Sequence, residues 1–272
     1  MNSNLTVIIT LYKTPEKYLK NLNQYKDYKI LIFDQATQNN SRIISKHLKT
    51  NFKYFFSKKN IGLPKATNFL ISKVKTDFFL FTQADIIIDK KSIKNLYDNI
   101  SKTNDVIFAG PKFLKSSLCH KNYNNKISKF VGKLDASLMI CSYKKVRNIG
   151  FFDKDYFLYW EDRDLMERVN KSNLKMKKIM NAFAVHESSK SSSNSISTLF
   201  IRRINFKFGE YLFEFKHKKI KKIKIIRNIF LNLILLPLNL ILFKKNMLIE
   251  NISQIIGTIK FLIYLIFNQY SP

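Results

Sequence analysis

Three carboxylates lie within four residues of one another in this chain: Glu161, Asp162 and Asp164. Six aromatic residues within 151–160 precede them, and apolar residues at helical spacing follow, so the acids should lie where an apolar loop enters a helix. A carboxylate held at such a place can act as a general base that takes a proton from a hydroxyl group. It can equally be a simple cap that the helix dipole favours. The three acids alone do not decide between these two interpretations.

Other polar side chains follow the ends of strand-like segments. Asp34 and Asp85 each come shortly after a short apolar run. Ligands of open α/β sheets bind outside the carboxyl ends of the strands, so these two acids are candidate contacts for a nucleotide. Gly62 predicts a tight turn before a helix, whose unpaired N–H groups and neighbouring Lys65 suit a phosphate.

Short apolar, β-branched runs alternate with helical patterns through most of the chain. This alternation predicts an α/β domain whose mostly parallel sheet is covered by helices on both faces. A polar, basic, asparagine-rich stretch at 112–129 predicts an exposed excursion. The expected strands are 5–11, 29–33, 53–56, 77–81, 105–109, 134–140 and 176–185, and the expected helices begin near Pro15 and cover 43–48, 91–100 and 144–149.

The sequence changes character after a serine-rich stretch at 188–197, for which we expect a hinge or a flexible lid. Six lysines fall within residues 216–224, and two apolar segments follow at 225–243 and 247–267. Polar residues interrupt both segments, so neither is a clean membrane span. We expect amphipathic helices that lie in a membrane interface, with the lysines on anionic headgroups. A membrane-spanning hairpin and ordinary packing onto the domain remain alternatives.

Composition bears on partner and compartment. Lys and Arg total 48 against 19 acidic residues, a net charge of +29, which suggests nucleic acid, anionic lipid or a phosphorylated substrate. A nucleic-acid-binding protein would interleave basic and aromatic residues in a defined module, and because no such motif occurs we expect no nucleic acid. Cys119 and Cys141 form no CxxC pair, and the N-terminus has no signal-peptide pattern, so we expect a cytoplasmic protein.

Several motifs together resemble those of family 2 glycosyltransferases with the GT-A fold, particularly the bacterial rhamnosyltransferase-like branch. Residues 60–68 match NxGxxxAxN, and residues 150–165 match GxFDxxFFxYxEDxDL. Residues 33–37 resemble the strand-end element VDNAS, and His186 with Ser191 resembles an HxxxxS element. The resemblance covers residues 5–205.

The resemblance implies a GT-A domain at residues 1–205, followed by a basic, apolar, helical membrane-associating region at residues 206–272. It implies an inverting hexosyltransferase whose donor is a nucleotide-sugar, dTDP-rhamnose or a UDP-sugar. The acceptor would be a lipid-linked or growing cell-surface glycan, for which the tail suggests a polyprenyl-diphosphate carrier. We therefore expect a cytoplasmic enzyme that is peripherally associated with the inner membrane.

The resemblance, the reaction it implies and the spacing of the acids together suggest roles for individual residues. Asp162 would be the general base, with Glu161 as the second choice or as an orienter of the acceptor, and Asp164 would cap the helix or pair with Arg168. Asp85 and His186 would hold a divalent cation, Mg²⁺ or Mn²⁺. The residues assigned to the donor are Thr10, Tyr12, Asp34, Asn60, Gly62, Lys65, Asn68, Gln83 and Asp85.

One departure from the family pattern concerns the metal. Gln83 stands where the family has the first acid of its DxD motif. Because an amide is a weak ligand for a hard cation, Asp85 would be the main ligand of the metal in this motif. The alternative function is a catalytically impaired GT-A domain that serves as a binding or scaffold subunit. A nucleotidyltransferase would need a glycine-rich phosphate loop, and residues 10–14 contain no glycine.

Overall fold

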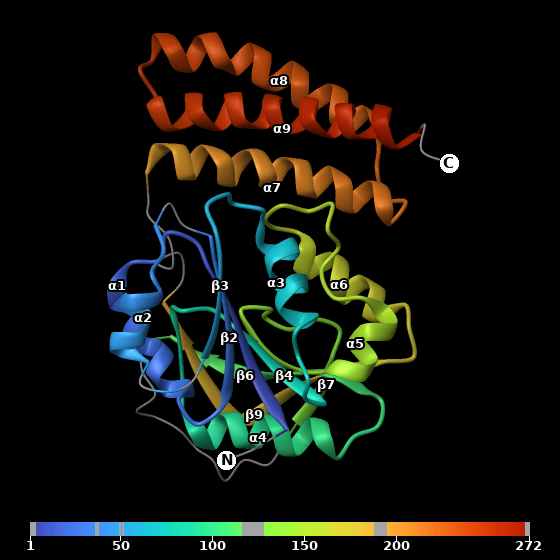
Figure 1. Ribbon diagram of the computed structural model, residues 1–272. Helices are drawn as coiled ribbons and strands as arrows, with labels where there is room; N and C mark the ends of the chain where they lie inside the picture. Colours follow the sequence, from blue (N-terminus) through green and yellow to red (C-terminus); the bar gives the residue numbers. More distant parts are fainter. Residues whose placement is uncertain are drawn as a thin grey trace. The chain divides into compact units, whose positions relative to one another are not determined.

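The computed structural model describes residues 4–35, 38–48, 50, 52–115, 128–187 and 195–269 (Figure 1). The chain forms two units. The sheet unit comprises Met1–Asp153 and Leu165–Ser193, and the helical unit comprises Lys154–Asp164 and Asn194–Pro272. The segment that carries Glu161 and Asp162 therefore belongs with the C-terminal helices, and residue 205 falls inside the helical unit.

The sheet unit has the strand order β3-β2-β1-β4-β8-β6-β9-β5, and β7 pairs with β9. The first four strands in this order, β3, β2, β1 and β4, are parallel to one another. In the other half, β8 is antiparallel to β4 and β6, and β5 and β7 are antiparallel to β9. The expected α/β sheet is therefore parallel in one half and mixed in the other. The strands are β1 (Leu5–Leu11), β2 (Lys29–Gln35), β3 (Phe52–Ser57), β4 (Phe78–Thr82), β5 (Ile86–Ile88), β6 (Val106–Leu114), β7 (Ser128–Val131), β8 (Leu138–Ser142) and β9 (Lys175–His186).

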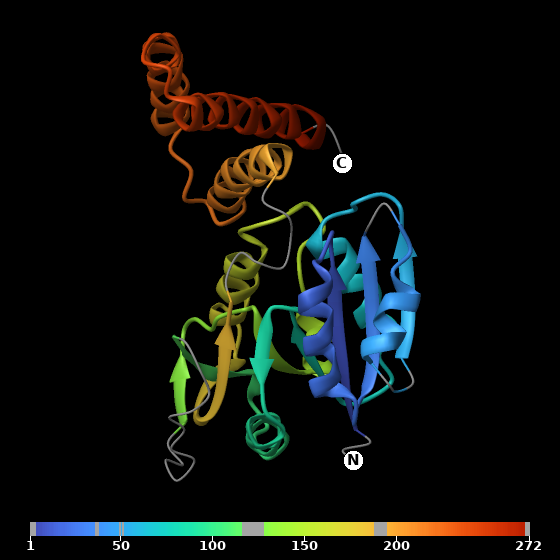
Figure 2. The ribbon, with the colours of Figure 1, turned by 90° about the vertical axis from the view of Figure 1, so that its left-hand side faces the viewer.

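The helices of the sheet unit cover both faces of its parallel half. Alternate side chains of a strand point to opposite faces, so Val7 and Ile9 of β1 pack in one core cluster and Ile8 packs in another. The first cluster includes residues of α1, η1 and α2, and the second includes residues of α3, which lies behind the strands in Figure 2. The helices of the sheet unit are α1 (Glu16–Leu19), the 3-10 helix η1 (Lys20–Tyr25), α2 (Ser41–His47), α3 (Leu63–Ile71), α4 (Lys90–Ser101) and α5 (Tyr143–Ile149). The first four residues of α6 (Glu161–Asn170) belong to the helical unit and the rest to the sheet unit.

Three expected boundaries differ from the structure. The helix after Pro15 is short and continues as the 3-10 helix η1. The strand expected to end at residue 109 continues through Pro111 to Leu114, because a register shift after Pro111 accommodates the missing N–H. The strand expected from residue 134 begins at Leu138, since Asp135 accepts hydrogen bonds from the backbone N–H and hydroxyl of Ser137 in a local turn.

Some sequence expectations lie outside the described residues. Residues 116–127 of the expected excursion are among them, whereas its two ends belong to β6 and β7. Residues 36–37 of the VDNAS-like element, and 188–194 of the serine-rich stretch with Ser191, are not described either.

The helical unit contains α7 (Ile196–Lys216), α8 (Lys222–Ile241) and α9 (Lys245–Gln269). α9 packs against both α7 and α8 (Figure 1). Tyr156 joins their core beside Tyr211 of α7 and Phe261 of α9. Among the described residues, α8 and α9 are the two helices whose length and composition would allow them to cross a membrane.

Candidate active site

Three of the predicted donor residues lie at the carboxyl ends of β1 and β2. Thr10 belongs to β1, Tyr12 follows it, and Asp34 of β2 pairs in parallel register with Leu11. Parallel pairing brings these strand ends to one edge of the sheet, as the sequence predicted. Thr10 and Tyr12 are both half-buried.

Asp34 is buried but keeps one oxygen unused. Its Oδ2 accepts hydrogen bonds from the Tyr54 hydroxyl at 2.8 Å and from the Asn40 side-chain amide at 2.9 Å. Its Oδ1 is buried and has no hydrogen-bond partner among the described residues. Burial raises the pKa of Asp34, and the two hydrogen bonds offset only part of that rise. Because a buried acceptor without a donor is unfavourable, Oδ1 is suited to an N–H group of a ligand.

The turn before α3 is built by side-chain hydrogen bonds. Gly62 has a φ of 87°, which favours glycine, and it is the N-cap residue of α3. The Asn60 Oδ1 accepts a hydrogen bond from the Gly62 N–H at 3.0 Å, and the Gln35 Oε1 accepts one from the Ile61 N–H at 2.7 Å. Lys65 is exposed in the first turn of α3. Asn60 therefore shapes the backbone that leads to the expected phosphate-binding helix end.

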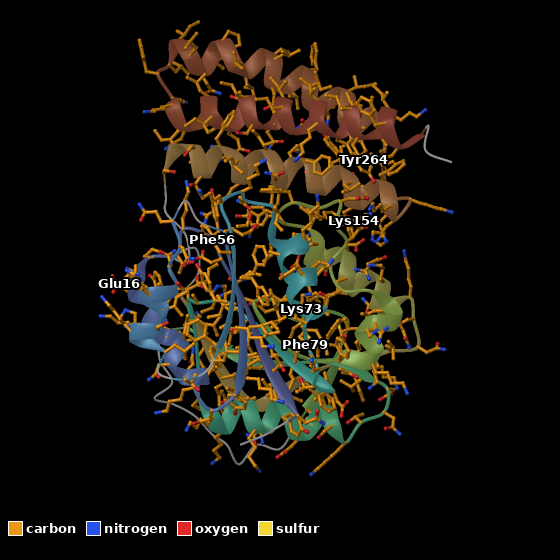
Figure 3. All side chains as sticks on the ribbon, viewed as in Figure 1. Glu16, Phe56, Lys73, Phe79, Lys154 and Tyr264 are labelled. Atoms are coloured by element: carbon orange, nitrogen blue, oxygen red, sulfur yellow. The ribbon has the colours of Figure 1, made fainter. Side chains whose placement is uncertain are left out.

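Asn68 connects α3 to the segment that precedes the acids. Its side-chain amide donates a hydrogen bond to the Phe152 carbonyl at 2.6 Å. The neighbouring Phe151 packs edge-to-face on Phe79 of β4, which Figure 3 labels, with 5.7 Å between ring centroids. The aromatic residues at this point of the motif thus belong to the core of the sheet unit.

Asp85 is fully buried in the loop between β4 and β5. Neither of its carboxylate oxygens has a hydrogen-bond partner among the described residues, and its Oδ2 lies 3.6 Å from His186 Nε2. The pairing of Ile86 with His186 across β5 and β9 brings the two side chains together. On the other side the Asn21 side chain donates to the Ala84 carbonyl at 3.1 Å, which helps to hold the loop.

Asp85 and His186 have the chemistry of a divalent-cation site. Burial lowers the pKa of His186, but Asp85 and Asp135 raise it by more, so the net shift is upward. A buried carboxylate that accepts no hydrogen bond is costly unless a cation neutralises it. No group of three or more His, Cys, Asp or Glu that could hold a metal occurs among the described residues. The pair therefore fits a cation that takes its other ligands from substrate and water, and half-buried Gln83 lies two residues before Asp85.

The acids at residues 161–164 begin α6 directly after a strained turn. Tyr159 and Trp160 have φ values of 70° and 72°, a left-handed conformation that costs bulky residues about 1–3 kcal/mol each. Contacts within the helical unit hold this turn, because the Trp160 ring centroid lies 5.6 Å from that of Phe206 and 5.4 Å from that of Phe213. The turn that these contacts hold leads directly into the first residue of α6.

Asp155 anchors the same segment to the C-terminal helices. It accepts hydrogen bonds from Lys216 of α7 at 2.6 Å and from Tyr264 of α9, labelled in Figure 3, at 2.8 Å. Burial raises the pKa of Asp155, but these two partners lower it by more, so the carboxylate stays ionised.

Gly209 of α7 allows the strained turn to approach the helix. A Cβ at this position would lie 2.9 Å from the Tyr159 carbonyl oxygen and 3.0 Å from Trp160 Cδ1. We predict that Gly209→Ala displaces the start of α6 and reduces kcat about tenfold or more, since small misplacements of a catalytic group have large effects. Steady-state kinetics measures this change.

The matched control is Gly132→Ala, whose new methyl group would lie 3.7 Å from the nearest atom, on Asn170. It should leave kcat unchanged. Equal kcat values for Gly209→Ala and the unmodified protein would show that the turn does not position the acids.

Glu161 and Asp162 differ in their surroundings. Glu161 is buried, its Oε2 has no hydrogen-bond partner among the described residues, and burial together with the neighbouring charge of Asp162 raises its pKa to about 8. Asp162 is half-buried. At neutral pH Glu161 is therefore mainly protonated and can donate a hydrogen bond. The indole N–H of Trp160 is also buried without a partner among the described residues.

The raised pKa of Glu161 predicts a pH dependence of stability. Its pKa rises from 4.5 to about 8 on folding, so the folded state binds more protons between these values and the free energy of unfolding falls as pH rises through this window. We predict that Glu161→Gln removes this fall, which is on the order of 4 kcal/mol at most. Urea denaturation at pH 5 and pH 8.5 measures it. An unchanged pH slope in the variant would contradict the assignment.

Asp164 has a partner that the sequence did not indicate. His217, which follows α7, places its Nε2 3.0 Å from Asp164 Oδ1, and both side chains are almost fully buried. Arg168 donates hydrogen bonds to the carbonyl groups of Ile149, Gly150 and Phe151. Asp164 thus has a structural contact within the helical unit.

The structure groups the predicted site residues in three places. The donor residues of β1, β2 and α3 lie in the sheet unit, Asp85 and His186 form a pair in the same unit, and Glu161 and Asp162 belong to the helical unit. Gln83 is placed near this pair only by its position two residues before Asp85. Sequence reasoning missed Asn40 and Tyr54, which hold Asp34, and Gly209, which accommodates the turn. Only Gly209 carried a signal, as a glycine within a helical pattern.

Comparison with known proteins gives a family match. The family model described as "Glycosyl transferase family 2" matches residues 6–160, more than half of the 272 residues. A sequence search among curated proteins gives no match.

Solved structures share the fold at low sequence identity. A mannosyltransferase from Pyrobaculum calidifontis, in complex with GDP-Man and Mn²⁺, is 13% identical with a TM-score of 0.56; the match covers 82% of this chain and 66% of that one. S. aureus TarS 1-349 is 13% identical with a TM-score of 0.55, covering 94% of this chain and 91% of that one. The complex of TarS 1-349 with UDP-GlcNAc is 16% identical with a TM-score of 0.52, covering 76% and 66%. These similarities establish the GT-A-like fold.

Proposed function

Because the chain belongs to glycosyl transferase family 2, we propose that it transfers a sugar with inversion from a nucleotide-sugar donor to a lipid-linked or growing cell-surface glycan. The observation that carries this proposal is the pair of buried acids at strand ends, Asp34 and Asp85, whose carboxylates keep oxygens without hydrogen-bond partners among the described residues. Such oxygens are explained by a ligand that donates to one and a cation that neutralises the other.

The donor is assigned to the sheet unit. Asp34 Oδ1 would accept a hydrogen bond from the nucleotide base, near Thr10 and Tyr12. The N-terminal end of α3, with Lys65 in its first turn, would receive the diphosphate because its N–H groups and the helix dipole favour anions. GDP-Man and UDP-GlcNAc bound to structural neighbours support a nucleotide-sugar. dTDP-rhamnose or a UDP-sugar remains the proposed donor.

Asp85 and His186 would hold Mg²⁺ or Mn²⁺, and Mn²⁺ in the mannosyltransferase complex supports a divalent cation. When bound, the cation would supply charge neutralisation for the diphosphate leaving group. Gln83 cannot add a charge, so Asp85 is the sole carboxylate of this motif.

Asp162 is the proposed general base. The acceptor oxygen bonds to the anomeric carbon while its proton passes to the Asp162 carboxylate, and the bond from that carbon to the phosphate oxygen breaks with its electron pair leaving on the nucleoside diphosphate. Glu161 is the second choice for the base. Its pKa of about 8 keeps it mainly protonated at neutral pH, so it suits a donor of a hydrogen bond that orients the acceptor.

The acceptor and location are proposed from the helical unit. The lysines at 216–224 and the exposed apolar side chains of α8 and α9 suit the anionic inner face of a membrane. A polyprenyl-diphosphate-linked glycan intermediate would be presented there. The protein is then a peripheral enzyme on the cytoplasmic side.

A second candidate function is a catalytically impaired GT-A domain that acts as a binding or scaffold subunit in glycan assembly. Gln83 favours it, because an amide is a weak ligand for a hard cation. Such a domain would retain donor binding and lose transfer.

A thermal-shift panel tests the donor proposal. dTDP-rhamnose, UDP-GlcNAc and GDP-Man are added with and without Mn²⁺, because a ligand that binds only the folded state raises the melting temperature. We expect a shift with one nucleotide class, and a larger shift with Mn²⁺. If no nucleotide-sugar shifts the melting temperature under any condition, the proposed donor class is wrong.

A further inference from the structure

α8 carries apolar side chains on its outside and polar side chains on its inside. Phe230, Leu233 and Ile234 are 63%, 57% and 51% exposed, and Leu240 is 60% exposed. Successive residues of a helix point about 100° apart, so these four side chains lie within an arc of about 120°. Leu231, Leu235 and Leu238 are also exposed, and they widen the exposed apolar surface to about 220° of the helix circumference. The two buried residues of α8 are both asparagines, Asn232 and Asn239. This is the reverse of a helix in a water-soluble bundle.

The buried asparagines form a ladder between α8 and α9. The Asn239 side-chain amide donates to Asn251 Oδ1 at 2.7 Å, and the Asn251 amide donates to Asn232 Oδ1 at 2.8 Å. Further along, the Thr258 hydroxyl donates to Asn228 Oδ1 at 3.2 Å. Hydrogen bonds of this kind hold helices together where no water competes and apolar packing gives no preference.

Two charged side chains within α9, Glu250 and Lys260, contact α7. Glu250 pairs with Arg203 at 3.0 Å, and Lys260 donates to Asn205 at 2.7 Å. Gly257 brings the two helices close, since a Cβ there would lie 2.7 Å from the Ile204 carbonyl oxygen. Polarity therefore falls across the helical unit from α7 through α9 to α8, and between residues 225 and 241 α8 has one charged residue, Arg227.

This gradient excludes two simple arrangements in a membrane. An interfacial helix needs a polar face for the headgroups, and the polar stripe of α8 is covered by α9. A spanning hairpin would carry α7, which packs along α9, through the hydrocarbon with Arg203, Lys207, Glu210 and Glu214, and buried charges of this kind are strongly disfavoured.

We infer that α8 and α9 lie within a single leaflet, with α8 in the membrane plane among the acyl chains. α9 then lies between α8 and the headgroups, and α7 lies at the headgroups. Two helices with axes about 8–10 Å apart and diameters of about 10–12 Å occupy about 18–22 Å, which matches one leaflet when its headgroup layer is included. Exposed lysines lie at both ends of α8, at 221–222 and 244–245, so both ends can reach the phosphates of one surface when α8 lies in the membrane plane. The partner is an anionic bilayer.

This inference refines the membrane attachment in the proposed function and is independent of the transfer chemistry. It can fail while the enzyme remains active on a soluble acceptor, and it can hold in a protein that has no transferase activity.

Tryptophan depth measurement tests the arrangement. Phe230→Trp on α8 and Ile201→Trp on α7 are compared in the full chain on vesicles of phosphatidylcholine and phosphatidylglycerol, and the emission of native Trp160, the only tryptophan, is subtracted using the unmodified protein. Lipids brominated on the acyl chain should quench Phe230→Trp at least twofold more than Ile201→Trp. Equal quenching of both, or of neither, would overturn the inference.

Two further measurements separate the alternatives. Asn246→Cys in a Cys119→Ser background should react with an impermeant maleimide added on the side where the protein bound, whereas protection would indicate a spanning hairpin.

Phe230→Ala should weaken vesicle partition about tenfold, as expected for one buried aromatic side chain, with Ile201→Ala as the unaffected control. A concentration-dependent dimer whose formation Phe230→Ala abolishes, without vesicle binding, would assign α8 to a second copy of the chain and contradict the lipid partner.

Discussion

Asp162→Asn should reduce the rate of sugar transfer about 10²–10⁴-fold, the range that a general base contributes. The substitution keeps the size and the half-buried position of the side chain but replaces the basic carboxylate with an amide, which cannot take up the acceptor proton. Donor binding belongs to the sheet unit and should not change, so the loss should appear in kcat while the thermal shift produced by donor stays the same.

The control for this variant is Asp98→Asn, which removes a carboxylate that forms an exposed ion pair with Lys94 on α4. It should leave transfer unaffected, because exposed ion pairs contribute little. Glu161→Gln should retain more activity than Asp162→Asn, since Glu161 is already mainly protonated at neutral pH. Normal turnover in Asp162→Asn would remove Asp162 from the mechanism, and a greater loss in Glu161→Gln would transfer the role to Glu161.

Asp85→Asn should lower transfer about 10³-fold or more and abolish the added thermal shift produced by Mn²⁺. A bound cation contributes several kcal/mol of charge stabilisation, and Asp85 is the carboxylate available for it. The amide still fits the buried loop, which the Asn21 and Gln24 side chains hold through the backbone. The variant should therefore stay folded and keep the donor shift that is measured without metal.

His186→Gln provides the matched comparison, because it should weaken the Mn²⁺ effect without removing the negative charge. The raised pKa of His186 adds a pH test. A metal ligand must be neutral, so the Mn²⁺-dependent shift should shrink on acidification in the unmodified protein more than in His186→Gln. Full Mn²⁺ dependence in Asp85→Asn would mean that the cation is held elsewhere.

Much of the fold could be predicted because buried parallel strands leave a clear pattern. The strand at 5–11 is apolar on both faces because both are buried: Val7 and Ile8 pack in the two different core clusters. Pairing order in the mixed half could not be predicted, because β6 lies between β8 and β9, which are distant from it in the sequence. Pro111 also misled the prediction, since a register shift lets the strand continue past it.

The positions of the candidate site residues in the fold could be predicted where a residue type and its local spacing carry the chemistry. Asp34, Gly62, Asp85 and Glu161 stand at strand or helix ends that the sequence marks. The partners that tune them could not be predicted, because Tyr54 reaches Asp34 from another strand and His217 reaches Asp164 over 53 positions. The raised pKa of Glu161 likewise follows from burial, which no local pattern indicates.

In the C-terminal apolar segments, too, contacts between distant residues could not be predicted. The apolar segments 225–243 and 247–267 suggested amphipathic helices in a membrane interface, because polar residues such as Asn232 and Asn239 interrupt them. These asparagines face α9, so their meaning depends on the pairing of two helices. The two helical segments could be predicted from the sequence, but which neighbour their polar side chains face could not.

Release of nucleoside diphosphate from a nucleotide-sugar is the most direct test of the proposed activity. Purified protein is incubated with the donor selected by thermal shift, with Mn²⁺ and without acceptor, beside the Asp85→Asn and Asp162→Asn variants. We predict slow hydrolysis that depends on Mn²⁺ and is lost in both variants. Tight donor binding with no release of nucleoside diphosphate, with or without a lipid-linked acceptor, would contradict the account and favour a binding or scaffold subunit.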